Sequence, residues 1–137
     1  MLKWLTRRRP VQPTPLAAVS PTRRQKLYTA ESGYVYEYCF QGYRVAEREQ
    51  VTGTEYVFDV SPDRTRWSAV RVFLADGCVA TWERERGRYL NSTERYALGK
   101  MALFRAFDTA PRPQELDHAV CVPAAAISEI LEALGID

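Results

Sequence analysis

The sequence predicts an α+β fold: an antiparallel meander of three to four strands packed by two to three helices, preceded by a disordered basic arm. Two periodicities support this class. Apolar residues alternate with a period close to two between Gly33 and Leu74, whereas those after Asn91 recur at helical spacing. Strands that come first and helices that follow favour a layered α+β arrangement over an alternating parallel-sheet fold. The length of 137 residues fits one domain.

Charge is divided unevenly along the chain. Residues 31–137 hold 12 bases and all 17 acids, a formal charge of −5. Residues 1–30 hold no acid and seven bases: Lys3, Arg7, Arg8, Arg9, Arg23, Arg24 and Lys26. Four prolines in the same segment disfavour helix and sheet, and the segment offers too little apolar surface to offset its ordering entropy. We therefore expect a disordered basic arm over 1–30 and a single α+β domain over 31–137.

The first strand is expected to carry a row of aromatic residues on one face: Tyr34, Tyr36, Tyr38 and Phe40. Gln41–Gly42 indicates a turn, after which residues 43–51 form a polar return strand. Thr52–Gly53 offers a second turn. Two further strands then show the same alternation, with the apolar residues Tyr56, Phe58 and Val60 in one and Val70, Val72 and Leu74 in the other.

Asp76–Gly87 allows two interpretations. Asp76–Gly77 is a hairpin signal. Alternatively, Asp76 caps a helix that has Val79, Trp82 and Arg86 at helical spacing and Gly87 as its end. The mixed-charge run before the terminal glycine favours the helix.

The clearest helix is expected over about 92–108, with Asn91 or Ser92 at its start and Glu94 placed as in a capping box. Its predicted sheet-facing residues are Tyr96, Ala97, Lys100, Met101, Leu103, Phe104, Ala106 and Phe107. Gly99 lies off that face. Residues 118–122 are a short strand or a connector. Pro123 then opens a last helix whose inward residues are Ile127, Ile130, Leu131 and Leu134.

The basic arm is the main functional signal. Its seven bases are the candidate nucleic-acid-binding residues, because mobile Lys and Arg gain affinity for phosphates by releasing condensed counterions. A second interpretation is attachment to anionic lipid through residues 2–9, with Leu2, Trp4 and Leu5 inserted. A third is a tail that only adds solubility.

The aromatic face of the first strand is either part of the core or a platform on which single-stranded bases stack. Core packing is favoured, because the helix over 92–108 offers Met101, Phe104 and Phe107 to receive the rings. No motif in the sequence decides between the two.

No metal, cofactor or catalytic residue is predicted. His118 and Cys121 have a ligand-like spacing that Cys39 and Cys78 would extend to a zinc set, but the latter two lie singly in apolar segments. Nucleophile-elbow, phosphate-loop and metalloprotease motifs are missing from the sequence. Enzyme chemistry would have to use a pocket around His118, the single histidine, and Cys121.

The sequence thus predicts a non-catalytic binding module that docks on a protein partner or on a second copy of itself. Its arm attaches it to an anionic polymer, for which nucleic acid is favoured over a membrane surface. The small enzyme and the membrane-surface protein are the alternatives, and no small-molecule substrate is inferred. Scattered cysteines and the lack of an apolar run after Arg7–Arg9 predict a cytoplasmic protein.

Overall fold

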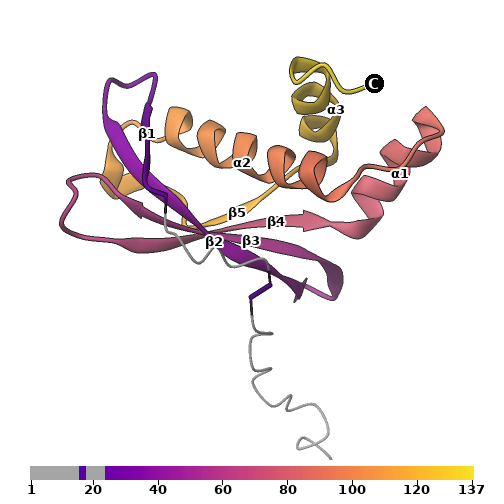
Figure 1. Cartoon of the computed structure of the whole chain (residues 1–137), viewed down its shortest axis with the longest axis horizontal. Helices are drawn as coiled ribbons and strands as arrows, with labels where there is room; N and C mark the ends of the chain where they lie inside the picture. The colour runs from indigo at the N-terminus through magenta and orange to yellow at the C-terminus, as the bar shows by residue number, and fades with distance from the viewer. Residues whose placement is uncertain (1–15, 18–23) are drawn as a thin grey trace, which may run out of the picture.

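The computed structural model describes residues 16–17 and 24–137, which form a five-stranded sheet with three helices on one face (Figure 1). The strands, in sheet order, are β1 (Lys26–Thr29), β2 (Val35–Arg48), β3 (Val51–Ser61), β4 (Ser68–Ala75) and β5 (Ala119–Cys121). The helices are α1 (Asp76–Arg86), α2 (Ser92–Thr109) and α3 (Ala124–Ala133), with a 3₁₀ turn at Pro113–Glu115. The predicted α+β class is confirmed.

The sheet is mixed, whereas the prediction was a purely antiparallel meander. Strands β1 to β4 are antiparallel neighbours, but β5 runs parallel to β4. A parallel neighbour requires a long crossover, and α1 and α2 provide it. Backbone bonds fix the pairing, with Arg71 N donating to His118 O at 2.9 Å and Val122 N to Phe73 O at 3.0 Å. Of the two interpretations of residues 118–122, the strand is therefore the one observed.

The predicted arm extends too far into the domain. Lys26–Thr29 pair with β2 as strand β1, and Ala30 is buried. Tyr28 explains this, since its ring stacks on Phe104 with centroids 4.2 Å apart and its hydroxyl donates to Asp108 at 2.7 Å. The rest of the predicted arm, apart from residues 16–17 and 24–25, lies outside the described residues.

The turns predicted at Gln41–Gly42 and at Thr52–Gly53 are both wrong. Strand β2 continues through the first as a β-bulge, where Gly42 has a φ of 143° that the missing Cβ permits. Gly53 lies inside β3, so close to the Leu74 carbonyl oxygen that no Cβ would fit. The chain reverses between them at Glu49–Gln50, with φ values of 50° and 69°.

Replacing Glu49–Gln50 by Asn–Gly is expected to raise the free energy of unfolding by about 0.5–1 kcal/mol. Two-residue hairpin turns of type I′ need positive φ at both positions, which Asn and Gly adopt at low cost. Urea unfolding measures the change. The same dipeptide at Glu31–Ser32, an exposed turn without positive φ, is the control and should give no gain. A loss of stability in the first variant would contradict the prediction.

Helix α1 confirms the helical interpretation of residues 76–87. Gly87 ends it in the left-handed conformation, with a φ of 68°. Asp76 is not the cap, because the extended residue before the helix is Ala75 and no side-chain bond caps it. The predicted capping box of α2 is present, with Asn91 Oδ1 accepting from Glu94 N at 2.8 Å and Glu94 Oε1 accepting from Asn91 N at 3.0 Å.

The sheet-facing side of α2 is rotated from the predicted one. Its buried residues are Leu98, Gly99, Ala102, Leu103 and Phe107, while Tyr96, Met101 and Phe104 are only partly buried. Gly99, predicted to lie off this side, sits against the Tyr56 ring, where a Cβ would be 3.0 Å from Cδ2. The missing side chain lets α2 approach the sheet closely. In α3, Ile127, Ile130 and Leu131 are buried as predicted, whereas Leu134, which follows the last helical residue, is exposed.

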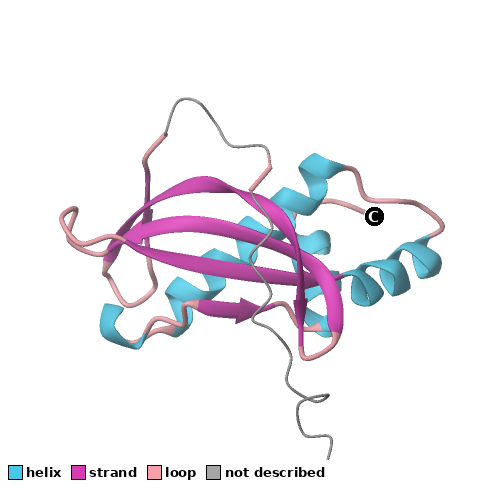
Figure 2. Cartoon of the chain, turned by 90° about the horizontal axis from the view of Figure 1, so that it is seen from below, coloured by secondary structure: helices cyan, strands magenta, loops and turns pink. Residues whose placement is uncertain are grey.

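The opposite face of the sheet is covered by no helix or strand of the described residues (Figure 2). Long side chains of the sheet itself shield it. Glu55, 6% exposed, accepts from Arg44 Nε at 2.9 Å and from Arg48 Nη2 at 3.1 Å, and Arg48 also lies over the Phe73 ring. Burial acts to raise the pKa of Glu55, but the two guanidinium groups outweigh burial and lower it.

Candidate functional site

Two of the seven predicted nucleic-acid-binding bases lie within the described residues. Arg24 is exposed just before β1, and Lys26 is the first residue of β1. Lys3, Arg7, Arg8, Arg9 and Arg23 lie outside the described residues. Of the predicted bases within the described residues, Lys26 is therefore the one that belongs to the sheet.

Lys26 and Lys100 form a lysine pair next to Tyr38. Lys26 is the cross-strand partner of Tyr38, and Lys100 reaches the same ring from α2, with Nζ 6.0 Å from the Tyr38 centroid and 5.7 Å from that of Phe104. Burial lowers the pKa of Lys100, and the neighbouring Lys26 ammonium lowers it further. Neither lysine forms an ion pair with a described carboxylate, and the residues outside the described ranges include no Asp or Glu.

An aromatic pocket opens near the start of α2, one helical turn from Lys100. Its volume is about 460 Å³, within the range of small-ligand sites. Four rings and four polar side chains line it: Phe40, Tyr43, Tyr56, Tyr96, Thr54, Ser92, Thr93 and Arg95. The pocket and the lysine pair therefore lie on the same side of the sheet.

The rings of the aromatic pocket are tilted against one another. The Phe40 and Tyr96 centroids are 4.7 Å apart with the planes at 58°, and those of Tyr43 and Tyr56 are 6.0 Å apart at 44°. The core contains both arrangements, since Tyr36 stacks on Phe107 at 7° whereas Tyr38 meets Phe104 at 76°. Tyr43 is exposed and Phe40 and Tyr96 are half-buried, so these three rings keep accessible surface beside the pocket, whereas Tyr56 is buried.

The polar groups of the pocket are suited to donating hydrogen bonds. Burial raises the pKa of Tyr56 to about 12, although the nearby Arg95 lowers it somewhat and Tyr43 raises it slightly. Burial also raises the pKa of Tyr96. Both phenols are therefore protonated at neutral pH. The Arg95 guanidinium has one ion-pair partner among the described residues, the Glu83 carboxylate at 3.6 Å.

Core packing, the favoured interpretation of the first aromatic face, is confirmed for Tyr36 and Tyr38, which are 0% and 4% exposed. Tyr34 is exposed, and Phe40 alone of this row lines the pocket. The group of pocket rings was missed because Phe40 and Tyr43 are three residues apart, a spacing that places residues on opposite faces of a regular strand. The bulge at Gly42 brings them to one face.

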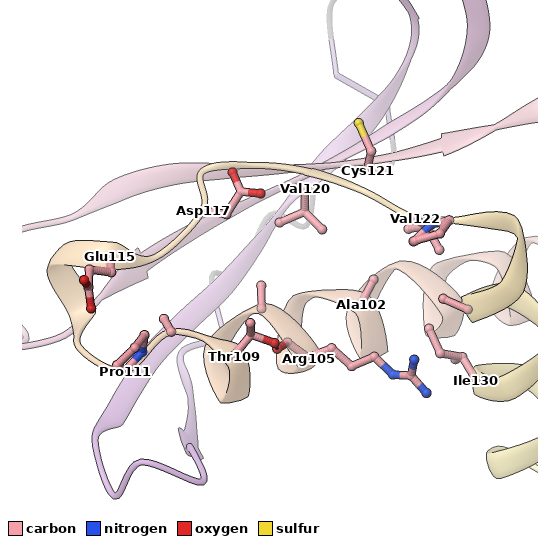
Figure 3. Close-up of a pocket in the computed structure, with 14 residues that line it drawn as sticks. Ala102, Arg105, Thr109, Pro111, Glu115, Asp117, Val120, Cys121, Val122 and Ile130 are labelled. Carbon is pink, nitrogen blue, oxygen red and sulfur yellow. The ribbon is translucent and has the colours of Figure 1, made fainter.

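A second cavity, of about 270 Å³, lies between α2, β5 and α3 (Figure 3). Its lining is mainly apolar, including Ala102, Val122 and Ile130. The Cys121 thiol points away from it, toward Arg48, whose Nη1 donates to Sγ at 3.2 Å. His118 is not in the lining, and its Nε2 lies 3.0 Å from Ser68 Oγ. The structure thus does not bring the imidazole and the thiol together in this cavity.

The cysteines and the histidine are spread over different elements. Cys39 is buried in β2, Cys78 is half-buried on α1 and Cys121 is exposed on β5. Within the described ranges, no three Cys, His, Asp or Glu residues are placed to hold a metal ion. The Cys₃His set considered from the sequence is therefore not assembled.

None of the described helices is long and apolar enough to cross a membrane. Fold and site together define a small α+β protein with an aromatic pocket and a lysine pair on the helix-covered side of its sheet. In comparisons with protein-family models, curated proteins and solved structures, the chain matches none of them.

Proposed function

We propose that the protein is a non-catalytic binding module that attaches to an anionic polymer, a nucleic acid, through the lysine pair and the bases of residues 1–30. The lysine pair is the observation that carries the proposal. Two like charges are held near one ring, Lys100 is partly desolvated, and neither lysine forms an ion pair with a carboxylate of the described residues. A phosphate at this position would offset their repulsion.

Two described parts of the basic N-terminal segment pair with the same edge of β2. Ala17 pairs with Tyr43, whose ring lines the aromatic pocket, through backbone bonds of 2.6 and 3.0 Å. Lys26 then begins β1 at the same edge of β2. The other bases of residues 1–30 would add phosphate contacts to those of the lysine pair, and each contact would release condensed counterions from the polymer.

The non-catalytic part of the proposal is supported by the positions of His118 and Cys121. The His118 imidazole is hydrogen-bonded to the Ser68 hydroxyl, and the Cys121 thiol points away from the apolar cavity. A Cys–His mechanism needs the two groups within hydrogen-bond reach beside a substrate cavity.

Fluorescence anisotropy with a labelled single-stranded oligonucleotide, between about 50 and about 200 mM salt, tests the proposal. Lys26→Gln with Lys100→Gln should flatten the dependence of log K on log salt by about 1.4, because each phosphate contact contributes about 0.7 on single strands. Replacing Arg7, Arg8 and Arg9 by Ala should flatten it by about 2 if all three meet phosphates.

Arg71→Gln with Arg84→Gln is the matched control. It removes the same charge from exposed positions on β4 and α1 and should leave the slope nearly unchanged. An equal effect of the two double variants, or no binding at low salt, would contradict the proposal. Binding to phosphatidylserine vesicles that is lost with Trp4→Ala, without binding to the oligonucleotide, would instead support attachment to a membrane surface.

A further inference from the structure

We infer that the aromatic pocket holds one unstacked base of a single-stranded nucleic acid, so that the protein prefers single strands to duplexes. This inference rests on the proposed attachment to a nucleic acid and adds the part of the polymer that the pocket recognises. Bases that are paired in a duplex are stacked on their neighbours, whereas bases of a single strand can leave the stack and lie on aromatic side chains.

The first argument is the orientation and exposure of the aromatic rings. Every ring pair around the pocket is tilted, by 36° for Phe40–Tyr56, 44° for Tyr43–Tyr56, 58° for Phe40–Tyr96 and 62° for Tyr56–Tyr96. Tyr43 is exposed, and Phe40 and Tyr96 are only half-buried, so these three rings keep accessible surface for a flat ligand.

The second argument is size and polarity. The pocket has a volume of about 460 Å³, which accommodates a planar heterocycle together with part of its sugar. Thr54, Ser92 and Thr93 place hydroxyl groups in its lining. Hydroxyl groups both donate and accept hydrogen bonds, so they match the mixed donors and acceptors on a base edge.

The third argument is the charge around the rings. Arg95 belongs to the lining itself, and Lys100 lies one helical turn along α2 from Tyr96. Lys26 stands across from Tyr38, two residues before Phe40 on β2. The lysine pair therefore lies on one side of the rings, where it can meet the phosphate next to a bound base, and Arg95 adds a cation within the pocket itself.

Three probes of equal length separate the base from the phosphates: a single-stranded oligonucleotide, the same strand with abasic sites throughout, and a duplex. The single strand should bind at least about fivefold more tightly than the abasic strand, which carries the same charge. The duplex should bind no more tightly than the abasic strand despite its higher charge density. Equal affinities for the single and abasic strands would overturn the inference and leave the proposed function standing. Failure of all three probes to bind would overturn both.

Tyr43 is the residue of choice for substitution, because its side chain is partly exposed and its loss should not unfold the protein. Tyr43→Ala should weaken binding of the single strand about fivefold or more and leave the abasic strand unaffected, while Tyr43→Phe should keep most of the affinity. Tyr34→Ala, at an exposed tyrosine outside the pocket, is the matched control and should change neither. A Tyr43→Ala effect no larger than that of Tyr34→Ala would count against the pocket.

A further measurement uses the unsubstituted protein, so that its result does not depend on how well a variant folds. One 2-aminopurine placed in the otherwise abasic strand should restore the affinity lost with the bases and should change its fluorescence on binding. Unchanged affinity and unchanged fluorescence would show that the pocket does not receive the base.

Discussion

Replacing Phe107 by alanine is expected to lower the free energy of unfolding by about 3–5 kcal/mol. The ring is 0% exposed and stacks on Tyr36 at a centroid distance of 4.3 Å, with Tyr28 and Phe104 at 5.6 and 6.3 Å. Its removal leaves a cavity between α2 and two strands that pair through their backbones, so the site can collapse only in part. Urea unfolding followed by circular dichroism measures the loss.

Phe104→Ala is the natural comparison, because the sequence pattern did not distinguish the two phenylalanines. Phe104 is only partly buried, so its truncation should cost about 1–2 kcal/mol, from partial burial and the stack on Tyr28. Equal losses in the two variants would show that the centre of the α2 interface lies closer to Phe104 than the structure places it.

The second large effect is expected at Glu55. Glu55→Gln should lower the free energy of unfolding by about 2–3 kcal/mol at pH 7. The amide has nearly the same shape as the carboxylate but cannot neutralise Arg44 and Arg48, whose nitrogens lie 2.8 and 3.1 Å from the carboxylate oxygens. Both arginine side chains remain about one-fifth exposed, which keeps the loss below that of a fully buried pair.

The pH dependence of this effect follows from the lowered pKa of Glu55. A carboxyl group whose folded-state pKa lies below its unfolded value stabilises the fold above the unfolded pKa, and this contribution disappears as the pH falls through the folded-state pKa. The difference in unfolding free energy between the native chain and Glu55→Gln should therefore be largest at neutral pH. It should shrink once the pH falls below 4.5, the ordinary pKa of a glutamate side chain.

Glu37→Gln is the control on the same face of the sheet. Its partner Arg64 is 72% exposed and 3.8 Å away, so the loss should stay under about 1 kcal/mol. A Glu55→Gln loss as small as this, or one that does not shrink in acid, would contradict the assigned role of the buried carboxylate.

Local chemistry made several elements predictable. The α2 capping box needs only Asn91 and Glu94 at the right spacing, and Gly87 ends α1 because it adopts positive φ without a Cβ clash. The buried residues of α3 could also be predicted locally, because their spacing matches the helical repeat. These signals act within one or two turns of chain, where few alternatives compete.

The turns were harder to predict, because a glycine marks several different conformations. Gly42 allows a bulge as readily as a reversal, and Gly53 is required by the close approach of β4 and not by a turn. Glu49–Gln50 carries no turn signature at all, and the reversal falls there because β2 and β3 pair over their whole length. Strand register is a property of both strands, so neither local segment contains it.

By itself the sequence determined the α+β class, the helices after residue 75 and the concentration of bases in residues 1–30. Only the tertiary structure determined which residues come together in the proposed binding surface. The aromatic pocket joins β2, β3 and α2, and the lysine pair joins β1 and α2. The physical reason is that periodicity reports which face of one element is apolar, whereas a pocket depends on a bulge, a register and a helix rotation that arise when several elements pack together.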